Sequence, residues 1–381
     1  MDNFPNILQD KLLERETENS LRTPGSLGNM IDFSSNDYLG FAGSEELFSA
    51  TNTYITENNI KANGATGSRL ISGNYGLYDV TEAYIAQLFN EESALIFNSG
   101  YDANLGFFSS VPQKGDVVLF DEYIHASIRD GLKLGPATSY KFPHNDVEAL
   151  YSLVERHRFK AGEMYIVTES VFSMDGDTPN LHDIADIARR YKCRLVVDEA
   201  HAVGVLGPGA LGLVPTISNH ENVFARIVTF SKAFGVHGAA VLGPAQLKNY
   251  LLNFARSFIY TTALPPHTLA AIFTSCKMMQ AMPQKQEDLH AIIMHFKEET
   301  EKLNLDFILS FSAIHCIIVP GNERVKRIAK KLQDQGFGIK AILSPTVPQG
   351  QERLRFCLHT YNTKTQVSKA LSILIQELRF L

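Results

Sequence analysis

Several side chains that could do chemistry follow directly after short apolar runs of the sequence. They include a lysine, an aspartate, two histidines and two hydroxyl groups. The residues are His125 after Val117–Asp121, Ser173 after Met164–Thr168, Asp198 and His201 at the end of Arg194–Asp198, and Thr229 and Lys232 at the end of Arg226–Phe230. Polar residues that close parallel strands meet at one edge of a sheet, where ligands bind in open α/β folds. We therefore expect them to form one site.

These residue types match what a pyridoxal 5′-phosphate site requires. The amine of Lys232 can form an imine with an aldehyde, helped by desolvation that lowers its pKa. The carboxylate of Asp198 can keep a pyridine nitrogen protonated, and the flat ring of His125 can stack on the cofactor. The N–H groups of Gly100 and Tyr101 open a predicted helix and can bind a phosphate dianion. Each residue alone also has an ordinary interpretation as a helix cap, a solvated histidine or a surface lysine, so the prediction depends on their combination.

The elements that must position these residues alternate between strands and helices. Six apolar runs predict strands buried on both faces, which is typical of parallel sheets. The runs are Ala94–Asn98, Val117–Asp121, Met164–Thr168, Arg194–Asp198, Arg226–Phe230 and Ala239–Leu242. The connector Leu181–Tyr191 has one apolar face and predicts a helix. These patterns indicate an α/β fold with a mostly parallel central sheet and helices on both faces.

The ends of the chain have different patterns. Residues 6–22 predict a short amphipathic arm, and residues 275–300 predict one long helix. After it we expect a smaller C-terminal α+β domain, with strands at Cys316–Val319, 338–343 and Arg353–His359 and helices near 322–335 and 364–378. The expected division is an N-terminal segment over 1–45, a large cofactor-binding domain over 46–272, and a small domain over 273–381.

The composition narrows the class of protein. The 381 residues carry 35 Lys and Arg against 41 Asp and Glu, a net charge of −6, which makes nucleic acid an unlikely partner. The four cysteines are far apart, so we expect neither a disulfide framework nor a metal site. The N-terminal residues lack the apolar stretch of a secretory signal, and no apolar run is long enough to span a membrane. We expect a cytoplasmic protein.

One competing motif indicates a different cofactor. Gly207–Gly212 satisfies the G-x-G-x-x-G pattern of dinucleotide-binding folds, and it leaves an NAD-dependent dehydrogenase as a distant alternative. Pro208 interrupts the motif, Pro215 would soon end a following helix, and no acidic residue stands about 20 residues further on.

Longer segments of the chain resemble one family over residues 10–378, the α-oxoamine synthases. These are pyridoxal-phosphate enzymes of fold type I, the aspartate-aminotransferase-like fold. The segments that carry the resemblance are Asp32–Gly40, Gly64–Asn74, Thr168–Asp177, Val197–His201 and Thr229–Gly235. Within the family, the segments Phe234–Leu242, Phe254–Thr262 and Pro345–Pro348 resemble most the branch that acts in biotin biosynthesis.

The resemblance implies a role for each matching position. Lys232 would be the Schiff-base lysine, Asp198 the partner of the pyridinium nitrogen, His125 the stacking and catalytic histidine, and His201 the partner of the phenolic oxygen. The phosphate would be bound by Gly100, Tyr101, Ser173 and Thr229, with Thr262 reaching it from a second subunit. On the substrate side, Arg355 would bind the amino-acid carboxylate near Asn36, and Arg22 and Thr346 would line the acyl side. Arg355 also fits this role on chemical grounds, because a guanidinium binds a carboxylate through two parallel hydrogen bonds.

The implied activity is the decarboxylative condensation of an amino acid, L-alanine, with a pimeloyl thioester of coenzyme A or a carrier protein, catalysed by a homodimer. Branches that use glycine with acetyl-CoA, or serine with a long acyl chain, are the alternatives. Two positions depart from the pattern. Leu343 stands where the biotin branch usually has an arginine, and Asp102 stands beside the expected phosphate site, where a small or neutral residue is more usual.

Overall fold

The computed structural model describes residues 4–218 and 220–379. Its chain divides into two compact units. The large unit holds residues 36–173 and 178–288, and the small unit holds residues 4–35, 174–177 and 289–379. Residues 4–35 therefore belong to the same unit as the C-terminal part of the chain, whereas residues 36–45 belong to the large unit. The three-domain division expected from the sequence stays a prediction.

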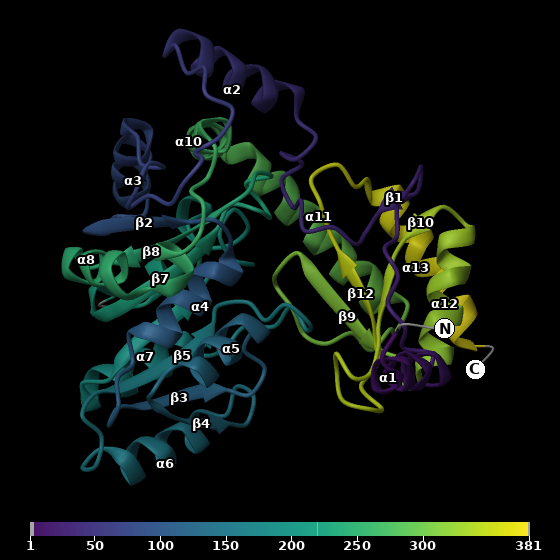
Figure 1. Ribbon diagram of the computed structural model, residues 1–381. Coiled ribbons are helices and arrows are strands. Elements are labelled where there is room, and N and C mark those ends of the chain that lie inside the picture. Colours follow the sequence, from purple (N-terminus) through teal and green to yellow (C-terminus); the bar gives the residue numbers. More distant parts are fainter. Residues whose placement is uncertain (1–3, 219, 380–381) are drawn as a thin grey trace. The chain divides into compact units, whose positions relative to one another are not determined.

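The large unit is built on a seven-stranded sheet in the order β2-β8-β7-β6-β5-β3-β4 (Figure 1). The strands are β2 Ser93–Phe97, β3 Val117–Asp121, β4 Thr138–Phe142, β5 Met164–Glu169, β6 Arg194–Asp198, β7 Val223–Thr229 and β8 Ala239–Gly243. Only β8 runs against its neighbours, while the pairs among β3 to β7 are parallel. The predicted mostly parallel sheet is confirmed. The edge strand β4 was missed, because it is exposed and polar over most of its length.

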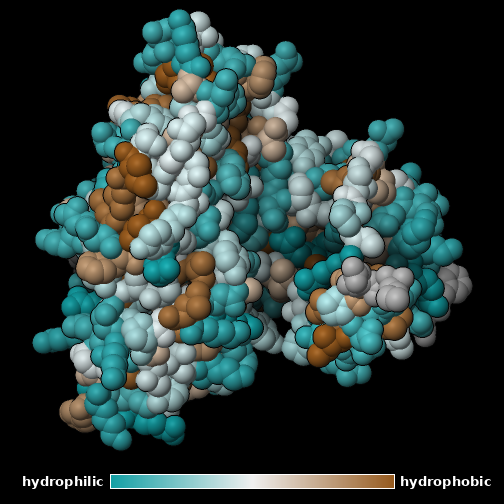
Figure 2. Space-filling model, viewed as in Figure 1, coloured by the Kyte–Doolittle hydropathy of each residue, from teal (hydrophilic) through white to brown (hydrophobic). Residues whose placement is uncertain are grey.

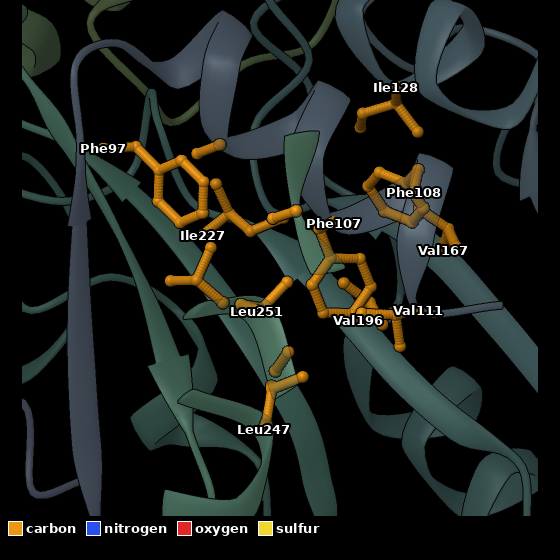
Figure 3. Close-up of a cluster of buried hydrophobic side chains, with 14 of the residues drawn as sticks. Phe97, Phe107, Phe108, Val111, Ile128, Val167, Val196, Ile227, Leu247 and Leu251 are labelled. Atoms are coloured by element: carbon orange, nitrogen blue, oxygen red, sulfur yellow. The ribbon is translucent and has the colours of Figure 1, made fainter. Parts of the chain in front are cut away.

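Helices cover both faces of this sheet. Four of them pack on one face, namely α4 Gly100–Ser110, α5 Ala126–Leu134, α8 Ala245–Phe254 and α9 Arg256–Ile259. Figure 3 shows side chains of this layer, including Phe107 of α4, Val196 of β6 and Leu251 of α8. The other face packs against α6 Val147–His157 and α7 Leu181–Tyr191. Burial on both faces explains why the central strands are continuous apolar runs.

Three further helices complete the large unit, and they correct one prediction. α2 Glu45–Glu57 and α3 Gly76–Leu88 pack against α10 Pro266–Ala281. The single helix expected over 275–300 is wrong, because α10 ends at Ala281 and a separate helix, α11, spans Pro283–Lys302. Pro283 has no N–H to continue the hydrogen-bond ladder, and its ring crowds the preceding turn.

The small unit has the expected α+β composition. An antiparallel sheet has the order β11-β12-β9, and a parallel pair joins β1 to β10. Its strands are β1 Ile31–Asp32, β9 Ile314–Ile318, β10 Phe337–Gly338, β11 Lys340–Ile342 and β12 Arg353–Cys357, and its helices include α1 Asn6–Thr17, α12 Asn322–Asp334 and α13 Lys364–Arg379. α1, the predicted arm, buries none of its side chains. Among the described residues, no helix combines the length and apolar character needed to cross a membrane.

Candidate active site

A cavity of about 220 Å³ lies in the large unit, where β6 and β7 end. Seven predicted positions line this cavity together: Gly100, Tyr101, His125, Asp198, His201, Thr229 and Lys232. They come from segments more than a hundred residues apart, and the parallel strands bring them to one edge of the sheet. The lining also contains Ser99, Asn104, Glu169, Ala200, Ile227 and Ser231.

Asp198 is held in one orientation at the end of β6. Its side chain is buried. One carboxylate oxygen accepts a hydrogen bond from the N–H of Ala200 at 2.9 Å, and the other accepts one from Nδ2 of Asn104 at 2.9 Å. These two hydrogen bonds fix the direction of the carboxyl group, as a partner for a ring nitrogen requires.

The start of α4 forms one corner of the cavity. Ser99 caps the helix, and its Oγ accepts the N–H of Asp102 at 3.1 Å while donating to the Asp102 carboxylate at 2.8 Å. These two hydrogen bonds account for Asp102, which does not line the cavity. The N–H groups of Gly100 and Tyr101 belong to the same helix start, where helices bind phosphates. A Cβ built on Gly100 would lie 3.8 Å from Oγ1 of Thr229, so this hydroxyl stands directly beside the corner.

His125 is fixed from two sides. Its backbone N–H donates to the carboxylate of Glu169, and its Nδ1 lies 2.7 Å from Oγ of Ser127. Burial lowers the pKa of His125; the charge of Asp198 opposes this effect, and that of Lys232 adds to it. The imidazole is therefore neutral near pH 7, as suits a ring that stacks on a cofactor and can still exchange a proton.

The sequence reasoning missed four side chains that support these residues. Asn104 donates from Nδ2 both to Asp198 and to Oγ of Ser127, the latter at 3.0 Å. A continuous chain of contacts therefore runs from His125 through Ser127 and Asn104 to Asp198. Separately, the hydroxyl of Tyr38 lies 2.7 Å from Nδ1 of His201.

Glu169 is the fourth of these side chains, and its place at the end of an apolar run could have identified it from the sequence. It closes β5 as Asp198 closes β6, and the two residues are register partners. Complete burial, followed by the nearby charge of Asp198, raises the pKa of Glu169 well above its ordinary value. The cavity therefore places a carboxyl that favours its neutral form beside a carboxylate that is hydrogen-bonded from two sides.

The residues of this cavity fit pyridoxal phosphate. An amine, an oriented carboxylate, a neutral imidazole and a helix N-terminus with an adjacent hydroxyl converge in one small space. Oδ1 of Asn104 is in addition a buried acceptor with no hydrogen-bond partner among the described residues. Buried polar atoms without partners are rare in folded proteins, and this one belongs to a residue that lines the cavity.

Two predicted phosphate residues do not line the cavity. Ser173 lies four residues beyond the end of β5, at the edge of the large unit. Thr262 is exposed, and its carbonyl accepts a hydrogen bond from Asn98 at 2.8 Å. The reach of Thr262 to a second subunit stays a prediction, as does the role of Ser173.

The predicted substrate residues lie mostly in the small unit. Arg355 is buried in β12, opposite Cys316 of β9 and Lys340 of β11. The neighbouring Arg353 forms an ion pair with Asp175, as expected for a structural strand arginine. In the large unit, Asn36 accepts a hydrogen bond from the Tyr38 hydroxyl at 3.2 Å.

The remaining two substrate residues contact each other. Nη2 of Arg22 donates to Oγ1 of Thr346 at 3.1 Å, and both line a second cavity, which lies within the small unit. Their proposed role on the acyl side rests on the resemblance.

The glycine motif lacks a dinucleotide-binding context. Gly207–Gly212 follows no strand directly, and only a 3-10 turn at Pro208–Ala210 forms within it. The carbonyl of Gly212 lies 1.7 Å from where a Cβ on Gly207 would stand. Glycine is therefore needed there to let two backbone segments meet, which explains the residue without a ligand.

Comparisons with known proteins agree with one another. A family model described as aminotransferase class I and II matches residues 28–374. A protein named putative 8-amino-7-oxononanoate synthase from Geobacillus kaustophilus is 40% identical over 343 residues, which cover 90% of this chain and 87% of that protein. An 8-amino-7-oxononanoate synthase of Emericella nidulans is 36% identical and covers 96% of this chain and 95% of its own.

Solved structures of two kinds superpose on this chain. The 8-amino-7-oxononanoate synthase of Francisella tularensis superposes with a TM-score of 0.79 at 31% identity, over 92% of this chain and 98% of its own. A high-resolution structure of SPT with a PLP internal aldimine superposes with a TM-score of 0.86 at 26% identity, over 92% of this chain and 88% of its own.

Proposed function

We propose, on the premise that this chain belongs to the aminotransferase class I and II family, that it condenses L-alanine with a pimeloyl thioester. The products would be 8-amino-7-oxononanoate, CO2 and a free thiol, as a step of biotin biosynthesis. The observation that carries the chemistry is the convergence of Lys232, Asp198 and His125 on one cavity. The choice of substrates is supported by relatives named 8-amino-7-oxononanoate synthase at 36 to 40% identity.

The family also settles the fold and the cofactor. The chain has fold type I and is a pyridoxal-phosphate-dependent enzyme, and its resemblance to the α-oxoamine synthases is confirmed. The roles of individual residues are part of the proposal.

In the proposed reaction, bound pyridoxal phosphate supplies a ring that accepts electrons from Cα of the amino acid. The Lys232 amine removes the Cα proton and later returns a proton to the product. With the cofactor bound, Asp198 would face the ring nitrogen and favour its protonated form, and His201, which the Tyr38 hydroxyl contacts, would donate toward the phenolic oxygen.

The new carbon–carbon bond then forms at the thioester carbonyl. Cα attacks the thioester carbonyl, a carbon–carbon bond forms, and the carbon–sulfur bond breaks to release the thiol. The original carboxylate leaves as CO2. His125 is the proposed hydrogen-bond donor to the carbonyl oxygen, through the N–H of its neutral imidazole. Arg355 is proposed to bind the carboxylate of the incoming alanine.

We also propose that the enzyme is a homodimer. Leu70, Ile71 and Tyr260 are large apolar side chains with exposed fractions of 54, 85 and 72%. Their segments meet where the N–H of Ala263 donates to the carbonyl of Gly67 at 3.0 Å. Figure 2 shows several apolar areas among the polar surface of the large unit. Exposed apolar side chains in two segments that meet beside Thr262 support the proposal that this threonine serves the site of a second subunit.

Serine palmitoyltransferase is the second candidate, favoured by the TM-score of 0.86 to the SPT structure. A third member of the family, 2-amino-3-oxobutyrate CoA ligase, would use glycine and acetyl-CoA. The experiment is to supply the holoenzyme with alanine and pimeloyl-CoA, serine and palmitoyl-CoA, or glycine and acetyl-CoA, and to measure thiol release and product mass. Thiol and 8-amino-7-oxononanoate from the first pair support the proposal, and turnover of either other pair alone refutes it.

A further inference from the structure

The loop that carries His125 begins at a buried acid that the proposed reaction does not use. Asp121 closes β3, and the chain then runs to His125, the N-cap of α5. The side chain of Asp121 has no exposed surface. β3 lies beside the edge strand β4 (Figure 1), and Asp121 is the register partner of Phe142, where β4 ends. A buried acid is costly unless its oxygens are hydrogen-bonded, so its partners indicate its role.

Three donor groups converge on the two oxygens of Asp121. Oδ1 accepts the backbone N–H of Tyr123 at 2.8 Å and lies 2.9 Å from Nδ1 of His144. Oδ2 accepts the backbone N–H of Asn145 at 2.8 Å. The carboxyl group therefore ties the loop that leads to His125 to the turn that follows β4.

Ring packing joins the same two segments a second time. The imidazole of His144 stacks on the ring of Tyr123, with centroids 4.3 Å apart and planes 24° from parallel. The ring of Phe172 meets that imidazole edge to face at 4.5 Å. The side chain of His144 is 18% exposed. One half-buried histidine thus contacts both the acid that starts the loop and the aromatic ring inside it.

These side chains hold a stretch that the sheet does not hold. Within the described residues, the last backbone hydrogen bond between the two segments runs from the N–H of Glu122 to the carbonyl of Phe142, at 3.0 Å. At the far end of the loop, Ile124 is buried in the apolar layer with α4 and α5, and the N–H of His125 donates to the carboxyl of Glu169. A site residue must be held to within about 0.5 Å of its working position, which requires anchors at both ends.

We propose that Asp121 and His144 are positioning residues for His125. They fix the backbone path from β3 to α5, so that the imidazole of His125 meets the bound cofactor ring and the thioester carbonyl in one orientation. Neither Asp121 nor His144 lines the cavity, so both act through the loop. The inference rests on the proposed function, because it concerns the histidine that the proposed reaction uses.

The test compares two histidines that have nearly the same ring contact. His157 ends α6 and stacks on Tyr140 with centroids 4.3 Å apart and planes 25° from parallel. His144→Phe and His157→Phe each keep an aromatic ring in the stack, but only the first removes the contact with Asp121. His144→Asn is the third variant, because its side-chain amide can donate to Asp121 in place of Nδ1.

The first readouts are the kinetics with alanine and pimeloyl-CoA. We expect kcat to fall by about 10- to 100-fold in His144→Phe, because a displacement of about 1 Å at the reacting groups costs a factor of about 100. The KM for alanine should change little, since Arg355 is the residue proposed to bind its carboxylate. His157→Phe should keep the wild-type kcat, and His144→Asn should recover most of the loss.

The second readout is the circular dichroism of the visible cofactor band, which depends on how the protein orients the bound ring. It is recorded on each purified holoenzyme without substrate, together with the melting temperature. The dichroism should change in His144→Phe and stay at the wild-type value in His157→Phe. Wild-type kcat in His144→Phe would overturn the proposal. A lower melting temperature with unchanged dichroism, and no recovery in His144→Asn, would also overturn it, because that result assigns His144 to stability alone.

The outcomes also separate this inference from the proposed function. If the dichroism changes as expected but no alanine is condensed with pimeloyl-CoA, the positioning role stands and the function fails. If all three variants condense the two substrates at the wild-type rate, the function stands and the positioning role fails.

Discussion

Asn104 is the residue through which the cavity of the large unit can be tested most sharply. Its Nδ2 joins Asp198 and Ser127 at 2.9 and 3.0 Å, so it links the carboxylate proposed for the ring nitrogen to the histidine proposed to stack on the ring. Replacing Asn104 with leucine keeps similar volume and removes the donor. Asp198 then retains one hydrogen bond, from the N–H of Ala200.

The size of the effect follows from the type of bond lost. A hydrogen bond to a charged group contributes about 1.5–3 kcal/mol, which corresponds to a factor of about 10 to 150. We expect kcat to fall by about this factor. The KM for alanine should change little, because Asn104 is proposed to orient the cofactor rather than to bind the amino acid.

The assay combines kinetics with the visible absorbance of the bound cofactor. The pH at which the absorbance band changes should shift in Asn104→Leu, because the orientation of Asp198 controls the charge on the ring. Ser110→Ala is the control, since Ser110 is a buried hydroxyl of the same helix that donates to the carbonyl of Gly106 and does not line the cavity. Wild-type kcat together with a wild-type pH titration in the Asn104 variant would refute the reasoning.

Three further predictions follow from neighbouring features. Arg355→Lys should raise the KM for alanine about tenfold, because the two parallel hydrogen bonds of a guanidinium are lost; steady-state kinetics with an unchanged KM would contradict its role. Glu199→Ala should lower the free energy of unfolding by roughly 3–5 kcal/mol, since it leaves the buried Arg226 without its closest partner, whereas the adjacent Asp198→Asn should lose activity and still melt near the wild-type temperature. Burial lowers the pKa of His315 to about 3. Below about pH 6.5 this histidine is therefore protonated in the unfolded chain but stays neutral in the folded one. The free energy of unfolding should fall by about 2 kcal/mol on acidification to about pH 5. His315→Phe should lose less stability over this interval in denaturant titrations, and an unchanged pH dependence would argue against this cause.

The positions of most central strands and the mostly parallel type of their sheet could be predicted, because burial on both faces leaves a direct trace in the sequence. β3, β5 and β6 each begin at the residue expected, and the polar ends of β5 and β6, Glu169 and Asp198, meet in the cavity. The edge strand β4 leaves no such trace, because its exposed face carries polar side chains. The chemistry of proline alone could have predicted that a helix ends before Pro283. The prediction missed this end because the helical pattern of apolar residues continues on both sides of Pro283.

The supporting contacts were harder to predict, because they depend on tertiary distance. Tyr38 and His201 are separated by 163 positions along the chain. Asn104 lies inside an apolar helix. A buried amide there implies a hydrogen-bond partner, but the sequence does not identify which residue that partner is.

The central claim is that Lys232 carries the cofactor as an imine. The direct measurement is to treat the purified holoenzyme with borohydride, which reduces an imine to a stable amine, and to map the modified peptide by mass spectrometry. We predict loss of the visible band and a pyridoxyl group on Lys232, with no such label in Lys232→Ala. A label on another lysine, or a visible band that survives in the alanine variant, would contradict the account.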